Sequence, residues 1–130
     1  METFEMKIRV VAEDIDEQDH VNNTVYLRWV QDVAVAHWRA LAPEEAQREI
    51  RWVVVRHEID YKAPGSPGEE LILRTWVGEA TRLRFERLTE IIRASDQRPL
   101  AKARTVWVPI SVTSGKPTRV SAEVRERFST

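Results

Sequence analysis

The chain has 130 residues and a formal net charge of −1, from 20 Lys plus Arg against 21 Asp plus Glu. This is the size of one domain, and the balance of charge lacks the positive excess that attracts nucleic acid. The absence of cysteine excludes disulfides, thiolate metal sites and a cysteine nucleophile. Apolar runs are only a few residues long and no basic-then-apolar signal begins the chain. We therefore expect a cytoplasmic protein of one domain, residues 1–130, with no membrane span.

The first predicted elements are a strand and an acid-rich loop. Between residues 4 and 10, apolar and charged side chains alternate, which is the pattern of a half-buried strand. The loop that follows carries Asp14, Asp16, Asp19 and His20. Carboxylates and an imidazole can serve as proton acceptor or nucleophile. Aspartates are also common in turns and caps, because their side chains bind nearby backbone amides.

A long helix is predicted directly after this loop. Asn22 or Asn23 can cap it, and its remaining free amides, at the positive end of the helix dipole, can polarise an anion or a carbonyl oxygen. The helix should end near Leu41, before Pro43 and a polar connection through residues 44–48. Its apolar residues recur at three- and four-residue spacing, at Tyr26, Trp29, Val30, Val33, His37 and Trp38.

The rest of the chain predicts four strands. Period-two alternation and flanking turn residues place them at 51–61, 71–77, 82–93 and 100–111. The clearest turn is the Pro- and Gly-rich stretch 63–68, and a short C-terminal helix is expected to begin near Ser121. One early helix followed by strands with short turns indicates an α+β fold, in which a curved antiparallel sheet packs around the helix.

Three stretches of sequence resemble a known family. DIDEQDHVNNTVYLRW (residues 14–29), EIDYKAP (58–64) and ARTVWVPI (103–110) resemble the hotdog-fold acyl-CoA thioesterases of the 4-hydroxybenzoyl-CoA thioesterase type. The first stretch also resembles the loop of plant acyl-ACP thioesterases. The resemblance implies a single hotdog domain with about five strands in the order 1-3-4-5-2. It further implies a homodimer or homotetramer, in which protomers join their sheets edge to edge and share active sites at the interface.

The same resemblance implies roles for residues of the loop. Asp16 matches the catalytic carboxylate of these enzymes, which acts as nucleophile on the thioester carbonyl or as general base for a water. His20 matches the histidine of the H-V-N-N element and is expected to orient the carbonyl or stabilise the developing oxyanion beside the helix amides. Gln18 falls where the plant enzymes carry a site asparagine. Gln18 and Asn23 are therefore expected to contact substrate.

The sequence departs from the family pattern at two positions. Many bacterial members have glycine where this chain has Asp19, and glycine lets the backbone approach a substrate closely. A carboxylate there could repel a thioester oxyanion unless it turns outward to solvent. Pro64 lies near a position where the plant enzymes have a further acid.

Basic residues are expected to bind the phosphates of coenzyme A through charge-assisted bonds. Arg82 and Arg84 are the expected substrate contacts, and Lys116 and Arg119 are further candidates. A solvated charged face is the alternative interpretation for each of them.

The remaining histidines and the tryptophans are interpreted as structural. His37 and His57 lie on apolar faces and are expected in the core or an interface. Three scattered histidines without cysteine do not form a ligand set, so no metal or cofactor is expected. The five tryptophans are expected to fill core and interface, with one or two lining an acyl pocket.

Three functional hypotheses follow. The first is a thioesterase that hydrolyses an acyl-CoA, or alternatively an acyl-carrier-protein thioester, with Asp16 as catalyst and without a nucleic-acid or membrane partner. The second is a non-catalytic hotdog module that binds acyl thioesters or serves in assembly, its site disabled by Asp19. The third is a hotdog dehydratase or hydratase, which requires a histidine and an acid on separate elements.

Overall fold

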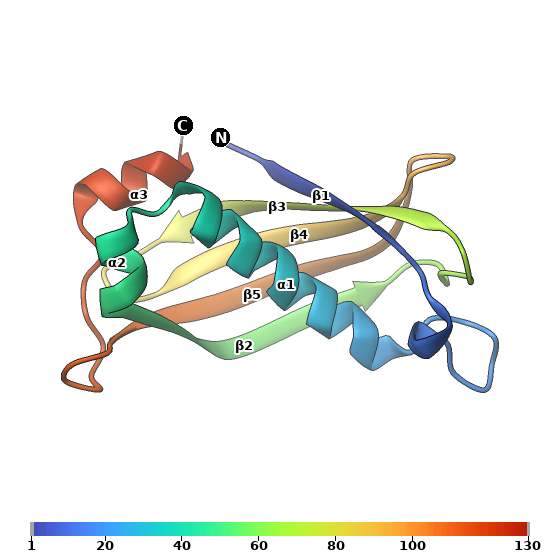
Figure 1. The fold of residues 1–130 in the computed structure, drawn as a ribbon, viewed down its shortest axis with the longest axis horizontal. Helices are drawn as coiled ribbons and strands as arrows, with labels where there is room; N and C mark the ends of the chain where they lie inside the picture. Colours follow the sequence, from blue (N-terminus) through green and yellow to red (C-terminus); the bar gives the residue numbers. More distant parts are fainter. Residues whose placement is uncertain (1, 130) are drawn as a thin grey trace.

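A long helix, α1 (Asn23–Leu41), crosses one face of a five-stranded antiparallel sheet in the computed structural model, which describes residues 2–129 (Figure 1). The strand order is β1-β3-β4-β5-β2. This confirms the expected α+β class, the long helix and the strand order. The strands are β1 (Phe4–Arg9), β2 (Ile50–Tyr61), β3 (Glu70–Ala80), β4 (Phe85–Arg93) and β5 (Arg98–Ser111).

Local chemistry sets both ends of α1. Asn22 is the N-cap, because its side-chain oxygen accepts hydrogen bonds from the Thr24 amide at 2.9 Å and the Thr24 hydroxyl at 2.8 Å. Asn23 is then the first helical residue. The helix ends where Ala42 adopts an extended conformation, as a residue before proline usually does.

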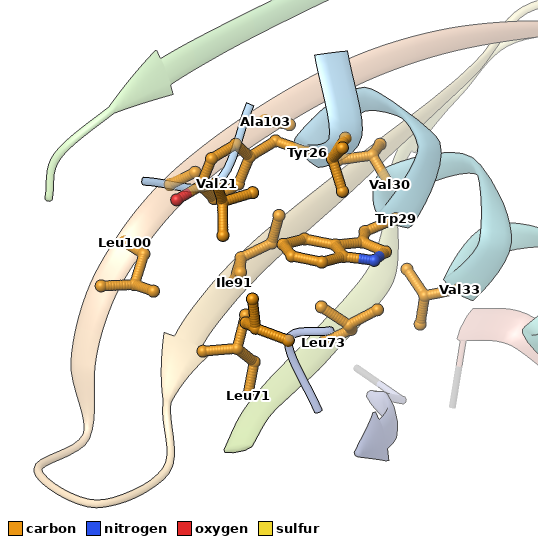
Figure 2. Packing of buried hydrophobic residues seen from close by; sticks show 13 residues of the cluster. Val21, Tyr26, Trp29, Val30, Val33, Leu71, Leu73, Ile91, Leu100 and Ala103 are labelled. Atoms are coloured by element: carbon orange, nitrogen blue, oxygen red, sulfur yellow. The ribbon is translucent and has the colours of Figure 1, made fainter. Parts of the chain in front are cut away.

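The main core lies between the sheet-facing side of α1 and the sheet (Figure 2). Trp29, Val30 and Val33 are buried against side chains of the central strands. Leu71 and Leu73 of β3 are fully buried, and burial of each such side chain stabilises the fold by about 1.5–3 kcal/mol. The helix is therefore held along its length, and its N-terminus has a fixed position at one end of the sheet.

Two short helices close the opposite end of the sheet (Figure 1). They are α2 (Glu44–Glu49) and α3 (Ala122–Ser129). The expectation of a polar connection through residues 44–48 was wrong, since this stretch is α2. Its acids in the first turn and Arg48 in the last suit the helix dipole, and Ala46 packs inward.

The β3–β4 connection has the expected length but lies three residues later in the sequence. β3 continues through Gly78 to Ala80, and β4 begins only at Phe85. Gly78 fits this strand because the Glu86 carboxylate crosses it, and a Cβ there would collide with Glu86 Oε1. Arg82 and Arg84 therefore lie in the connection rather than on a strand.

β1 and β2 form the two edges of the sheet. The outer edge of β2 runs for 12 residues and pairs with no strand in residues 2–129, while Val53 and Val55 are 41% and 49% exposed. None of the helices in this part of the chain combines the length and the apolar character that a membrane crossing requires.

Candidate active site in the loop before α1

The loop between the first strand and α1 is a small closed hairpin. Ile15 and Val21 pair as an antiparallel bridge. Between them, the Asp16 amide donates to the His20 carbonyl at 2.9 Å, and the Asp19 amide donates to the Asp16 carbonyl at 3.1 Å. The loop backbone is therefore fixed around Asp16.

Asp19 occupies the position in this hairpin that needs unusual backbone geometry. Its φ is +61°, in the left-handed region that glycine adopts freely and that aspartate tolerates better than most residues. This gives a backbone reason for the glycine of related loops. The Asp19 side chain is exposed, so its charge can be hydrated by solvent.

Asp14 has a structural role. It is 3% exposed and ends the short 3-10 helix Ala12–Asp14. One carboxylate oxygen accepts from the Val11 amide at 3.0 Å, and the other accepts from Arg28 Nη2 of α1 at 3.0 Å. The Asp14 carbonyl also accepts from the Asn22 amide at 2.9 Å. Because both side-chain oxygens are bonded, Asp14 joins the loop to the helix start and is not free to act on a substrate.

Asp16 is arranged differently, with one oxygen held and one available. Its Oδ1 accepts from the Gln18 amide at 2.8 Å, which forms a local turn. Its Oδ2 has no hydrogen-bond or ion-pair partner within residues 2–129. The half-buried side chain lines an open hollow together with Gln18 and the N-cap residue Asn22. The structure thus places an oriented carboxylate beside the start of α1.

The amides at the start of α1 are only partly used. The Thr24 amide donates to the Asn22 side chain, and the Val25 amide donates to the Asn22 carbonyl. The Asn23 amide has no protein acceptor within residues 2–129. An amide at a helix N-terminus can stabilise negative charge that develops on a substrate oxygen.

The other two expected loop residues, His20 and Asn23, do not line the hollow beside Asp16. His20 is exposed, and its imidazole has no hydrogen-bond partner in the described chain. The side chain of Asn23 is also exposed, while its carbonyl accepts from the Tyr61 hydroxyl at 3.1 Å. Neither residue lines the hollow. Of the expected site residues, the structure brings Asp16 and Gln18 together.

The expected coenzyme A contacts lie at the other end of the molecule. Arg82 and Arg84 follow β3, whose C-terminal end lies beside α3, whereas the loop that carries Asp16 lies at the opposite end of the sheet (Figure 1). Within one chain, these arginines therefore do not lie beside Asp16, and their role as coenzyme A contacts stays a prediction. The sheet, more than 10 residues long along β3, separates them.

One buried charged residue was missed by sequence reasoning. Arg87 is 8% exposed and lies on the face of β4 that also carries Phe85 and Thr89. A charged residue on the inward face of an alternating strand was the available signal.

The fold and loop define an α+β domain in which an antiparallel sheet wraps a long helix and a carboxylate lies beside the helix N-terminus. The family model of the thioesterase-like superfamily matches residues 10–128. The chain belongs to this superfamily and is a thioester hydrolase of the hotdog fold, as the sequence resemblance implied. A search of curated proteins gives no match.

Solved structures show the same fold. A 1,4-dihydroxy-2-naphthoyl-CoA thioesterase from Synechocystis has a TM-score of 0.83 at 21% identity, covering 98% of this chain and 96% of that one. A DHNA-CoA thioesterase from Staphylococcus aureus has a TM-score of 0.85 at 19% identity, covering 98% and 89%. A probable thioesterase, YbaW, from Escherichia coli has a TM-score of 0.80 at 22% identity, covering 95% and 94%.

Proposed function

We propose that the protein hydrolyses an acyl-CoA thioester to a free acid and coenzyme A, with Asp16 as the catalytic carboxylate. The observation that carries this proposal is the unequal bonding of the two Asp16 oxygens. Oδ1 is held by the Gln18 amide, and Oδ2 is left without a protein partner beside the helix start. A positioned carboxylate with a free oxygen can accept a proton from water or attack the carbonyl carbon.

The start of α1 supplies the second requirement of the reaction. Attack on a thioester places negative charge on the carbonyl oxygen, and donors aimed at that oxygen lower the barrier. The free Asn23 amide is a donor at the start of the helix, and the helix dipole favours negative charge at the same end. Addition of water and expulsion of the thiolate, which then takes up a proton, give one carboxylic acid and one thiol. His20, exposed on the same hairpin, is proposed to contact the carbonyl once substrate is bound.

A second copy of the chain is proposed to complete the site. The free outer edge of β2, with its exposed Val53 and Val55, is a surface on which a second β2 can add antiparallel. Antiparallel pairing brings the Tyr61 end of one β2 to the Ile50 end of the other. Tyr61 contacts the start of α1, so the loop of one chain approaches the end of the other chain that carries its arginines.

This arrangement gives Arg82 and Arg84 a role that a single chain does not. Both directly precede or flank the start of β4. Phe85 of β4 pairs with Trp107 of β5, and Trp107 pairs with Val54 of β2, so the two arginines lie toward the Ile50 end of β2. We propose that they bind the phosphates of a coenzyme A whose thioester lies at the Asp16 of the other chain. Titrating the dimeric protein with free coenzyme A tests this, because Arg82→Gln combined with Arg84→Gln should weaken binding, whereas Arg48→Gln, on the exposed side of α2, should not.

The experiment that tests the function is a measurement of thiol release from short-chain, long-chain and aromatic acyl-CoAs. Release of one thiol per acid formed from at least one substrate supports hydrolysis. Binding of acyl-CoA without thiol release supports a non-catalytic module instead. Conversion of a β-hydroxyacyl substrate to an enoyl product, with the thioester intact, supports a dehydratase.

A further inference from the structure

A second cavity lies between α1, α3 and the sheet, at the end remote from the Asp16 loop. Its volume is about 350 Å³, within the range of pockets that hold small molecules. Ala34, which lines it, lies 11 residues beyond Asn23 along α1, a distance of roughly 17 Å at the rise of an α-helix. The well-packed Trp29 and Val30 fill the intervening stretch of the helix face. The cavity is therefore separate from the hollow at Asp16.

Aromatic side chains form much of the cavity wall. Trp52 packs edge to face against Trp38 at 5.4 Å between ring centroids and against Phe85 at 5.1 Å. Trp107 and Phe128 complete this set. Aromatic rings prefer edge-to-face and offset-stacked neighbours, so such a wall favours an aromatic ligand over a flexible chain.

Arg87 places a buried positive charge at this apolar cavity. Its Nη1 donates to His37 Nδ1 at 2.8 Å and to Thr75 Oγ1 at 3.3 Å. Both acceptors are neutral, and no carboxylate of residues 2–129 lies within 4 Å of the guanidinium. Burial lowers the Arg87 pKa to about 10, so the group is still charged at neutral pH. A buried charge without a counter-ion is costly, and its remaining donors match a carboxylate.

Two further donors, on tryptophans of the cavity wall, have no acceptor. Trp52 Nε1 and Trp107 Nε1 are buried, and neither has a hydrogen-bond partner in the described chain. Two carboxylates belong to the wall. Glu86 is already used, because it accepts from the Glu79 amide and from Arg104, and Glu126 is exposed to solvent on α3. The buried side-chain groups of the wall residues that have no partner are thus donors.

We propose that this cavity binds a small aromatic carboxylate, with the carboxylate paired to Arg87 and the ring held among the tryptophans. The structure offers one competing explanation for Arg87. His37 Nε2 lies 3.5 Å from Glu2 Oε1, so Arg87, His37 and Glu2 could serve only to hold the N-terminal segment against the core. A binding measurement separates the two explanations, and it does not depend on thioester hydrolysis.

The test is isothermal titration of the full chain with naphthoate and with naphthamide, its neutral counterpart of the same shape. The parent should bind naphthoate at least about tenfold more tightly, because only the acid forms a charge-assisted pair. Arg87→Met should abolish this preference while leaving naphthamide binding unchanged. Ala122→Trp, which places a large side chain at an exposed lining position on α3, should weaken both ligands.

Binding to this cavity should be independent of the Asp16 site. Asp16→Asn should bind naphthoate as the parent does, whatever its effect on hydrolysis, so failure of the proposed function would leave this inference standing. Equal binding of the acid and the amide by the parent, or no binding of either, would overturn it. So would naphthoate affinity that is unaffected by Ala122→Trp. These comparisons decide the question even if Arg87→Met does not fold.

Discussion

Arg87 Nη1 and His37 Nδ1 lie 2.8 Å apart in the buried interior. Arginine can only donate, so His37 Nδ1 must be the acceptor and the ring proton must reside on Nε2, which faces Glu2. His37 is therefore neutral in the folded protein. Burial, assisted by the positive charge of Arg87, lowers the His37 pKa to about 4.

This pair predicts a specific loss of stability in acid. Between pH 6.5 and about 4 the unfolded chain binds a proton at His37 and the folded chain does not, so stability falls as the pH is lowered through this range. The contribution of neutral His37 to the free energy of unfolding is present in full above pH 6.5. Its loss amounts to roughly 3 kcal/mol. Urea unfolding of the parent and of His37→Gln at several pH values measures it. An equal loss of stability with falling pH in the two proteins would contradict the assignment of this loss to His37.

The bonded carboxylate of Asp14 predicts a structural defect when it is removed. Asp14→Ala leaves the Val11 amide and Arg28 without their acceptor, so the free energy of unfolding should fall by about 1–3 kcal/mol. Asp32→Ala is the matched control, because Asp32 is exposed and lies 4.0 Å from the same arginine. Chemical denaturation should show little change for the control. Equal effects of the two substitutions would show that burial of Asp14 is unimportant.

Packing between α1 and the sheet predicts a large effect at Leu73. Its side chain is fully buried among residues of the main core (Figure 2), so Leu73→Ala should lower the free energy of unfolding by about 2–5 kcal/mol. Val112→Ala, at a 49% exposed position, should change it by less than about 0.5 kcal/mol. Equilibrium denaturation of both variants provides the comparison. A loss below about 1 kcal/mol for Leu73→Ala would contradict the packing described.

The free edge of β2 predicts an effect on oligomeric state. Val55→Asp places a charge on the exposed edge strand and should convert the proposed dimer to a monomer, with loss of thioester hydrolysis. Val112→Asp introduces the same charge at an equally exposed position after β5 and should leave the dimer intact. Sedimentation velocity distinguishes the two states. A Val55→Asp protein that is both dimeric and active would exclude this edge as the interface.

Much of the fold could be predicted because it depends on local periodicity. The spacing of apolar residues predicted α1 to its end at Leu41, and alternation predicted the strands. α2 was missed because five polar residues and one alanine carry no periodic signal. The segment is helical where Ala46 packs against the core. The C-terminal helix, expected from Ser121, was confirmed at Ala122–Ser129.

The geometry of the candidate site was predictable only where it depends on residues close together in the sequence. The turn at Asp16 involves a residue two positions away, so its sequence was sufficient. Arg87 illustrates the opposite case, because its neutral partner His37 lies 50 residues away in the sequence. His37 itself was expected as a bonded core histidine, and this was confirmed. Arg82 lies far from the Asp16 loop because it follows the end of β3. The alternation of apolar residues did not predict the residue at which β3 ends.

The most direct test of the central claim is the rate of thioester hydrolysis by Asp16→Asn. With an acyl-CoA that the parent hydrolyses, kcat/KM should fall by about 10²–10⁴-fold, since the amide can neither accept the proton nor attack the carbonyl. Circular dichroism and oligomeric state should be unchanged, because the amide oxygen can still accept from the Gln18 amide. Glu13→Gln, an exposed acid in the same segment, should hydrolyse at the parental rate. Hydrolysis by Asp16→Asn at that same rate would contradict the account.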